Sequence, residues 1–329
     1  MLASGFKPGI SWGAGVVRSS PDSDVGLASA RLPDPRARQQ GRLMDINTKP
    51  DGGSKARSGA EADSEQLLAQ VGVVSPGTVA DYQRQGWIVL AGLLPARLVA
   101  ELLAFAKSEM GPDADNPRYA GRGARYAAWS NAARDSSWLR AVSQSAELAT
   151  VASTLSGGRA LRWYGDSFLA KKRSDEGGTR TPWHQDLPQH AFDRGGALTM
   201  WIPLVDCPAA KGTMRFLTGS HRAGPLGRFG RRADGAERTE DVVDTYPEVT
   251  TRYPVSPPLD LRAGDVTVHD ALTVHSAPEN ETDSIRWVYS ITWFPAETLY
   301  TGAYSYHTNG LGLKVDQPFD DLHFPVVSV

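Results

Sequence analysis

A short triplet, His184-Gln185-Asp186, places a histidine and an aspartate two residues apart. On an extended segment, residues i and i+2 point to the same side, so the imidazole and the carboxylate can reach one metal ion. Two ligands do not complete a metal site, and taken alone the triplet is better explained by a surface histidine beside a solvated aspartate. A metal site therefore requires a third ligand from elsewhere in the chain.

The third ligand is expected from His275, which ends a largely apolar run over residues 266–274. Arg286 follows and opens another run, Arg286-Trp-Val-Tyr-Ser-Ile-Thr-Trp-Phe294. If this run is a strand, Arg286 shares one face with small and polar residues, while the bulky aromatic residues lie on the other face. A guanidinium that faces the interior needs an anionic partner, and a carboxylate binds it through two parallel hydrogen bonds.

Two histidines and one carboxylate on one side of a metal form the facial triad of non-haem Fe(II) oxygenases, which leaves positions open for a co-substrate and oxygen. An arginine shortly after the last histidine suits the far carboxylate of 2-oxoglutarate. The sequence therefore predicts that His184, Asp186 and His275 bind Fe(II) and that Arg286 binds 2-oxoglutarate.

The chain has two regions of different composition. Residues 1–64 are rich in Gly, Ser, Ala, Pro, Arg and Asp and carry no sustained apolar period, so we expect a disordered N-terminal extension. Met44 lies within it, and a start of translation there would leave residues 1–43 out of the protein; a peptide from that stretch in mass spectra would disprove this hypothesis. Residues 65–329 are expected to form one catalytic domain.

Helical patterns come first in this domain, and short strands follow. A capping box at residues 78–81 predicts a helix that ends at Gly86, and Pro95 suits position N1 of an amphipathic helix. A further helix is expected over residues 137–155, and strands over residues 87–90, 161–172, 197–205, 213–217, 265–275 and 286–294. Helices followed by many short strands indicate an α+β, mainly β fold whose second part is a sandwich or jelly roll.

Taken together, these features resemble the phytanoyl-CoA dioxygenase family of 2-oxoglutarate-dependent oxygenases. The matching segments are residues 82–90, 182–186, 198–201 and 212–221, Gly264-Asp265, and His275 followed by Arg286. The resemblance covers roughly residues 75–295. It implies a double-stranded β-helix core (a cupin-like jelly roll) with flanking N-terminal helices, and Fe(II), 2-oxoglutarate and O2 as cofactor and co-substrates.

The resemblance also implies roles for single positions. Those of His184, Asp186 and His275 hold iron in the family, that of Arg286 binds 2-oxoglutarate, and those of Gln185 and Trp201 line the co-substrate pocket. A lysine on the strand before the first histidine often contributes; Lys172 fits best, and Lys171 stays open. One departure is Ala277, where many members carry a hydroxyl residue; the missing hydrogen bond is worth about 0.5–1.5 kcal/mol.

The reaction implied is hydroxylation of a small molecule with release of succinate and CO2. Related halogenases replace the carboxylate ligand with a small residue, whereas Asp186 is retained here, so hydroxylation is favoured over other outcomes; desaturation or ring chemistry stays open. Two alternatives differ in class: a cupin-like metalloenzyme that does not use 2-oxoglutarate, and a non-catalytic binding barrel. Arg286 discriminates against the first, and the intact set of four site residues argues against the second.

Composition limits the classes of partner and the location that we expect for this chain. The net charge is −2 and no long basic run is present, so neither nucleic acid nor an anionic membrane is an expected partner. The most apolar stretch, residues 86–106, is interrupted by charged residues and proline and does not predict a membrane span. A single cysteine, Cys207, and the absence of a signal-peptide pattern predict a cytoplasmic enzyme. Without a basic patch for a CoA phosphate, a free small molecule is preferred as substrate; nothing predicts an oligomeric state.

The remaining histidines have more than one interpretation. His269 lies six residues before His275, and on one regular strand both would face the same side, so it is an alternative ligand or a substrate contact. His190 is close to the triplet and lines the substrate entrance or lies in a solvated loop. His307 and His323 lie in an irregular C-terminal stretch and are expected to be structural.

Overall fold

A computed structural model describes residues 65–120, 126–226, 229–231, 237–239 and 241–327. These residues fall within one compact unit, residues 53–329. The expected extension over residues 1–64 lies outside the described residues, so its disorder and the start at Met44 stay predictions. No helix of the described ranges is long and apolar enough to cross a membrane, and the cytoplasmic location likewise stays a prediction.

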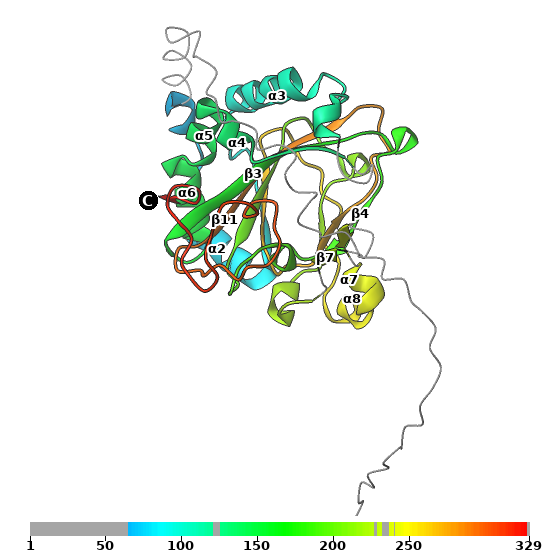
Figure 1. The fold of residues 1–329 in the computed structure, drawn as a ribbon. Coiled ribbons are helices and arrows are strands. Elements are labelled where there is room, and N and C mark those ends of the chain that lie inside the picture. Colours follow the sequence, from blue (N-terminus) through cyan, green and yellow to red (C-terminus); the bar gives the residue numbers. More distant parts are fainter. Residues whose placement is uncertain (1–64, 121–125, 227–228, 232–236, 240, 328–329) are drawn as a thin grey trace, which may run out of the picture. The chain divides into compact units, whose positions relative to one another are not determined.

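Two antiparallel sheets form the core of the domain (Figure 1). The strand order of the larger sheet is β1 (Trp87–Leu90), β9 (Val266–Asp270), β5 (Leu198–Pro203), β11 (Arg286–Pro295), β3 (Leu161–Lys171) and β12 (Val326–Val327), and β2 (Ala127–Ser130) also pairs with β3. The smaller sheet has the order β4 (Thr181–His184), β10 (His275–Ala277) and β6 (Arg215–Phe216). This arrangement confirms the predicted jelly roll with its flanking helices.

Helices cover the outer face of the larger sheet (Figure 1). They are α2 (Pro76–Gln85), α3 (Ala96–Met110), α4 (Ala132–Asp135), α5 (Ser137–Ser143) and α6 (Ala146–Leu155), while α7 (Val242–Thr245) and α8 (Glu248–Arg252) lie near β4. Short 3₁₀ turns include η4 (Leu187–Gln189), and β7 (Phe229–Arg231) pairs with β8 (Glu237–Thr239).

Three helix boundaries differ from the prediction. The first of the predicted helices, α2, begins at Pro76, because the Ser75 hydroxyl accepts a hydrogen bond from Thr78 N and caps it. It ends at Gly86, as predicted, in a left-handed conformation that glycine adopts without strain. Pro95 is the N-cap and not N1. The single helix expected over residues 137–155 is wrong, because Ser145 caps a second helix within it.

The alternation predicted along β11 is confirmed. Trp287, Tyr289 and Ile291 are buried in one apolar cluster with residues of α3, α5 and α6. Val288 packs in a different cluster, with Trp201 of the neighbouring strand β5. The aromatic face of β11 therefore packs against the helices, and the face that carries Arg286 lies inside the barrel.

The single strand expected over residues 265–275 is wrong. β9 ends at Asp270, whose carboxylate accepts a hydrogen bond from Leu272 N (2.8 Å) and whose carbonyl accepts one from Thr273 N (2.8 Å). These two bonds close a turn, after which His275 opens β10 in the smaller sheet. The apolar run is continuous in sequence but is divided between the two sheets.

Asp166 ties the helical layer to β3. Its carboxylate is buried and accepts hydrogen bonds from Ala133 N (3.1 Å to each oxygen) and from the Tyr289 hydroxyl (2.9 Å). Its carbonyl accepts a hydrogen bond from the backbone N–H of Asn131 (2.7 Å). Burial raises the pKa of Asp166 to about 7, although the donated hydrogen bonds favour the ionised form.

This pKa gives the stability of the domain a testable dependence on pH. The unfolded chain releases the Asp166 proton near pH 4, whereas the folded chain keeps it up to about pH 7. The stabilising contribution is therefore complete below about pH 4 and is lost as the pH rises through about 7. In the wild type, the unfolding free energy should therefore fall by at most about 1.4 kcal/mol per pH unit between these limits. We expect this contribution to the slope to be absent from Asp166→Asn.

Urea unfolding of the two proteins at several pH values between these limits measures the difference. Asp113→Asn, at an exposed position, is the control and should follow the wild type. If the Asp166→Asn curve runs parallel to the wild-type curve, Asp166 does not hold a proton in the folded protein.

Candidate metal centre

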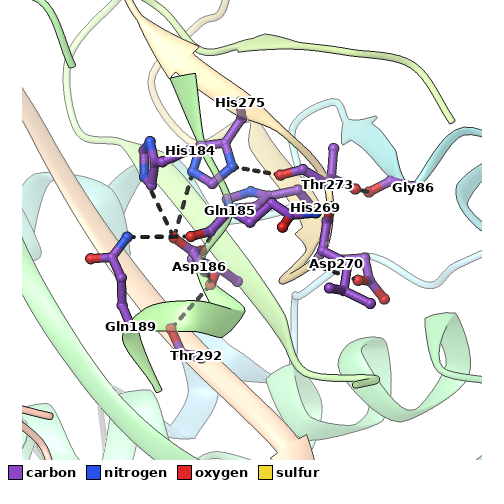
Figure 2. Close-up of polar contacts among 12 residues, drawn as sticks. Gly86, His184, Gln185, Asp186, Gln189, His269, Asp270, Thr273, His275 and Thr292 are labelled. Atoms are coloured by element: carbon purple, nitrogen blue, oxygen red, sulfur yellow. Dashed lines mark hydrogen bonds and ion pairs between the residues drawn. The ribbon is translucent and has the colours of Figure 1, made fainter. Parts of the chain in front are cut away.

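His184 and His275 face each other across the smaller sheet. They are register partners in the antiparallel pair of β4 and β10, and their ring centroids are 4.2 Å apart. Asp186 follows the end of β4 and extends toward both rings, so that its Oδ1 lies 3.6 Å from the Nε2 atom of each (Figure 2). The three donor atoms lie within 4.8 Å of one another, a spacing suited to a metal ion. Strand pairing thus brings together the three residues that the sequence singled out.

The backbone sets the orientation of both rings. His184 Nδ1 lies 2.8 Å from the carbonyl of Pro182, and His275 Nδ1 lies 2.9 Å from that of Thr273. A carbonyl only accepts, so each Nδ1 carries a proton, and in the neutral imidazole the lone pair is then on Nε2. Ring orientation by a hydrogen bond on the far nitrogen is typical of metal-binding histidines.

The charge states also suit a divalent metal. Burial, with the neighbouring His184 and His269, holds the pKa of His275 well below its usual range, so its imidazole is neutral. Burial alone would raise the pKa of Asp186, but its electrostatic interactions with His275, His269 and His184 and the hydrogen bond from His269 hold that pKa well below its usual value, so the carboxylate is ionised. A metal requires neutral imidazoles and an ionised carboxylate, and His275 and Asp186 are in these states.

The second oxygen of Asp186 is engaged by the larger sheet. Thr199 Oγ1 of β5 donates to Asp186 Oδ2 at 3.1 Å, and His269 Nε2 of β9 lies 3.1 Å from the same oxygen. His269 was predicted as an alternative ligand or a substrate contact because it was placed on one strand with His275. The structure puts it on the other sheet, where its Nε2–H donates to the carboxylate. Oδ1 is left to face the two histidines.

We expect that this pair of donors controls metal affinity. His269→Phe and Thr199→Val each leave Oδ2 with one donor fewer and free the carboxylate to rotate, which should weaken metal binding roughly 10- to 100-fold. Competition for Fe(II) or Co(II) against a chromophoric chelator measures the affinity. Thr199→Ser keeps the hydroxyl and should retain nearly the wild-type value. Equal affinities for Thr199→Val and Thr199→Ser would show that the donor is irrelevant.

Arg286 and Lys171 form a buried pair of cations near the metal group. They are register partners on β11 and β3, and both are almost completely buried. Lys171 Nζ donates to the carbonyls of Ala277 (3.2 Å) and Pro278 (2.9 Å). Arg286 Nη1 donates to the carbonyl of Gly212, while its buried Nε has no hydrogen-bond partner among the described residues. No carboxylate of those residues pairs with Arg286, so the pocket is suited to an anionic ligand.

Two other predicted co-substrate residues lie in different surroundings. The ring of Trp201 lies 5.3 Å below the guanidinium of Arg286, in accord with a place in that pocket. Gln185 is buried and bonded to the backbone: its Nε2 donates to the carbonyls of Gly224 (3.0 Å) and Leu272 (2.6 Å), and its Oε1 accepts from Leu226 N. Gln185 therefore holds loops together behind the triplet.

The prediction of Lys172 as the co-substrate lysine on the strand before His184 also needs revision. Lys172 follows the end of β3 and is half-buried, whereas Lys171 is the register partner of Arg286. Alternation explains the difference, because only one of two adjacent strand residues points inward. Sequence reasoning missed Thr199; its position on the inward face of an alternating strand is the only signal that pointed to it.

The two-sheet barrel with two histidines and a carboxylate beside a buried arginine defines the class of non-haem iron, 2-oxoglutarate-dependent oxygenases. Within this class the chain belongs to the phytanoyl-CoA dioxygenase family, whose model matches residues 82–288. No curated protein matches the chain.

Solved structures of the class resemble the chain over most of its length. The non-haem α-ketoglutarate-dependent carbocyclase SnoK from nogalamycin biosynthesis is 25% identical with a TM-score of 0.64, over 78% of this chain and 97% of SnoK. The epimerase SnoN from the same biosynthesis is 28% identical with a TM-score of 0.61, over 81% and 99%. EctD from S. alaskensis, solved with 2-oxoglutarate and 5-hydroxyectoine, shares the fold at 18% identity and a TM-score of 0.58, over 76% and 90%.

Proposed function

We propose that the chain is an oxygenase that binds Fe(II) through His184, Asp186 and His275, binds 2-oxoglutarate through Arg286, and oxidises a small organic molecule. The observation that carries this proposal is the combination of a three-ligand group with a buried guanidinium that lacks an acidic partner among the described residues. The donor set suits a divalent iron ion, and the unmatched cation suits the far carboxylate of the co-substrate.

Each protein group has a separate task in this scheme. Bound iron would supply the activation of oxygen, coupled to the oxidation of 2-oxoglutarate to succinate and CO2. Arg286 anchors the co-substrate and Trp201 limits the pocket on one side. Thr199 and His269 keep one oxygen of Asp186 turned toward the metal position. The side chains of His184 and Asp186 are 14% and 18% exposed to solvent, whereas that of His275 is 4% exposed. The substrate therefore approaches from the side of His184 and Asp186.

Hydroxylation is the outcome that we propose first, because the carboxylate ligand is retained. A second candidate is removal of hydrogen from the substrate with ring closure or inversion of a stereocentre. It is supported by the identity of 25–28% with a carbocyclase and an epimerase. Mass spectrometry of the product separates the outcomes: hydroxylation adds one oxygen atom, ring closure removes two hydrogens, and inversion leaves the mass unchanged.

Succinate release tests the proposal directly. Purified protein is incubated with metabolite fractions, and succinate is measured with Fe(II), 2-oxoglutarate and oxygen present, or with each omitted in turn. We expect substrate-stimulated release only in the complete mixture. If anaerobic Fe(II) and 2-oxoglutarate give no visible charge-transfer band, the chain does not bind the co-substrate at iron. A cupin-like enzyme without 2-oxoglutarate would then be the better description.

A further inference from the structure

A cavity of about 210 Å³ lies apart from the candidate metal centre, where α2, α6 and β9 end. Tyr82 and Gln83 of α2 contribute to its lining, as do Leu155 and Ser156 at the end of α6. Asp270, the last residue of β9, belongs to the same lining. None of the candidate metal ligands takes part in it. The cavity is therefore a separate position at which this chain can hold a ligand.

Asp270 is directed away from the metal group. It follows His269, and adjacent residues of a strand point to opposite faces. Since His269 contacts Asp186 inside the barrel, Asp270 lies on the outer face, and Figure 2 shows it apart from Asp186. One carboxylate oxygen of Asp270 accepts a hydrogen bond from Leu272 N at 2.8 Å. The other oxygen has no hydrogen-bond or ion-pair partner among the described residues, so it can accept from a ligand.

The cationic groups around the cavity do not neutralise this carboxylate. His221 lines the cavity, and its Nε2–H donates to the carbonyl of Gln83 at 3.1 Å. Burial lowers the pKa of His221, so the ring is neutral near pH 7. Arg159 also lines the cavity but forms an ion pair with Glu297 at 2.5 Å. Burial raises the pKa of Asp270, as expected when the negative charge of a carboxylate is incompletely compensated.

The surroundings of Asp270 favour a positive charge in the cavity. Helices α2 and α6 end at the C-cap residues Gly86 and Ser156, and both residues line it. The C-terminus of a helix carries a partial negative charge and stabilises a nearby cation. Burial, with the charge of Asp270, raises the pKa of Tyr82 well above its usual value. The phenol is therefore neutral and lies near the carboxylate, and its hydroxyl has no hydrogen-bond partner among the described residues.

The size and chemistry of the lining suit an organic cation better than a metal ion. Ca²⁺ takes six to eight oxygen ligands and Mg²⁺ six, whereas Asp270 is the only acidic residue that lines the cavity in the described part of the chain. The side chain of Leu155 and the ring of Tyr82 are apolar surfaces for a hydrocarbon group, and the face of an aromatic ring also attracts a cation. Most ligand pockets have volumes of roughly 300–1,000 Å³, so this ligand is small.

We propose that this cavity binds a small primary alkylammonium ligand, at a site separate from the metal centre and beyond the proposed oxygenase function. The ammonium group donates to the free oxygen of Asp270 and to the hydroxyl of Tyr82, and the hydrocarbon part packs against Leu155. The turn after Asp270 also supports the metal triplet, because the carbonyl of Ala271 accepts a hydrogen bond from Leu187 N at 2.9 Å. The ligand is therefore bound directly behind the metal centre.

Three probes of similar shape test the proposal. Cyclopentylammonium, cyclopentanol and cyclopentanecarboxylate are titrated at pH 7, where an alkylamine is protonated, into the full chain without added metal, and saturation-transfer NMR gives each Kd. We expect the ammonium to bind about ten-fold or more tightly than the other two, as for a hydrogen bond between charged groups. Asp270→Asn keeps an acceptor for Leu272 N and should remove this preference. Tyr82→Phe keeps the ring and should weaken ammonium binding about two- to ten-fold.

Asp265→Asn is the matched control. Asp265 precedes the other end of β9, is half-buried like Asp270, accepts a hydrogen bond from Arg262 N at 2.8 Å and lies outside the cavity. This variant should keep the preference for the ammonium probe, and circular dichroism shows that each variant is folded. A wild type without the preference, including one that binds none of the probes, overturns the site, and so does a preference that survives in Asp270→Asn. Fe(II) with 2-oxoglutarate should not displace the ammonium probe; displacement would place the probe in the metal centre and contradict a separate site.

Discussion

Arg286→Met is expected to abolish the binding of 2-oxoglutarate while leaving the protein folded. Removing one partner of a buried, hydrogen-bonded charge pair costs roughly 2–5 kcal/mol, which corresponds to a loss of about thirty- to several-thousand-fold in Kd. Without the co-substrate, however, Arg286 is a buried cation with no acidic partner among the described residues. Replacing such a group with an apolar residue of similar volume is often neutral or stabilising.

Thermal unfolding measures both the loss of 2-oxoglutarate binding and the change in stability of the ligand-free protein, which we expect to be neutral or favourable. The wild-type midpoint should rise when 2-oxoglutarate is added, because a ligand that binds only the folded state stabilises it. The Arg286→Met midpoint should start at or above the wild-type value and should not respond to the ligand. Arg215→Met, at an exposed arginine of β6, is the control and should respond as the wild type does. An equal response of the Arg286 variant would exclude this residue as the co-substrate anchor.

Asp186→Asn should lose iron more completely than the removal of one negative charge would suggest. Thr199 and His269 both direct donors at Oδ2, so the amide of an asparagine will turn its oxygen toward them. Its NH2 group then points at the metal position, where a donor is repelled. We expect a loss of affinity beyond the roughly 10- to 100-fold that follows when a partner orienting a metal ligand is removed.

Iron content after anaerobic reconstitution, measured by elemental analysis, checks this expectation. In the double variant Asp186→Asn with Thr199→Val, one of the two donors is absent, so part of the affinity should return. Asp193→Asn, at a carboxylate that pairs with Arg194, is the control and should retain iron. Stoichiometric iron in Asp186→Asn would remove Asp186 from the ligand set.

Much of the candidate site is predictable from local patterns. The spacing of His184 and Asp186 is enough to turn two donors to one side, and the alternation of residues 286–294 is enough to turn Arg286 inward. Both depend on a period of two along an extended chain, which the sequence displays directly. The same period separates the aromatic face of β11 from its polar face, and this separation is confirmed by the two clusters in which the faces pack.

Other parts depend on how distant segments pair. The apolar run before His275 gave no sign of a turn at Asp270, because the hydrogen bonds that close it use a side chain and backbone that any strand could contain. Once the turn is present, His275 and His269 belong to different sheets, and their roles separate into a candidate ligand and a donor to Asp186. The preference for Lys172 over Lys171 was wrong for a related reason. Pairing with β11 sets where β3 ends and therefore which of the two lysines points inward.

Residue types and short-range spacing are sufficient to predict the fold class, the four residues of the candidate iron and co-substrate site, and the inward face of β11. The fold as a whole is needed to make His184 and His275 cross-strand partners and to bring Thr199 and His269 to the far oxygen of Asp186. These contacts join residues far apart in the chain. Their geometry follows from strand pairing and register, which no local pattern specifies.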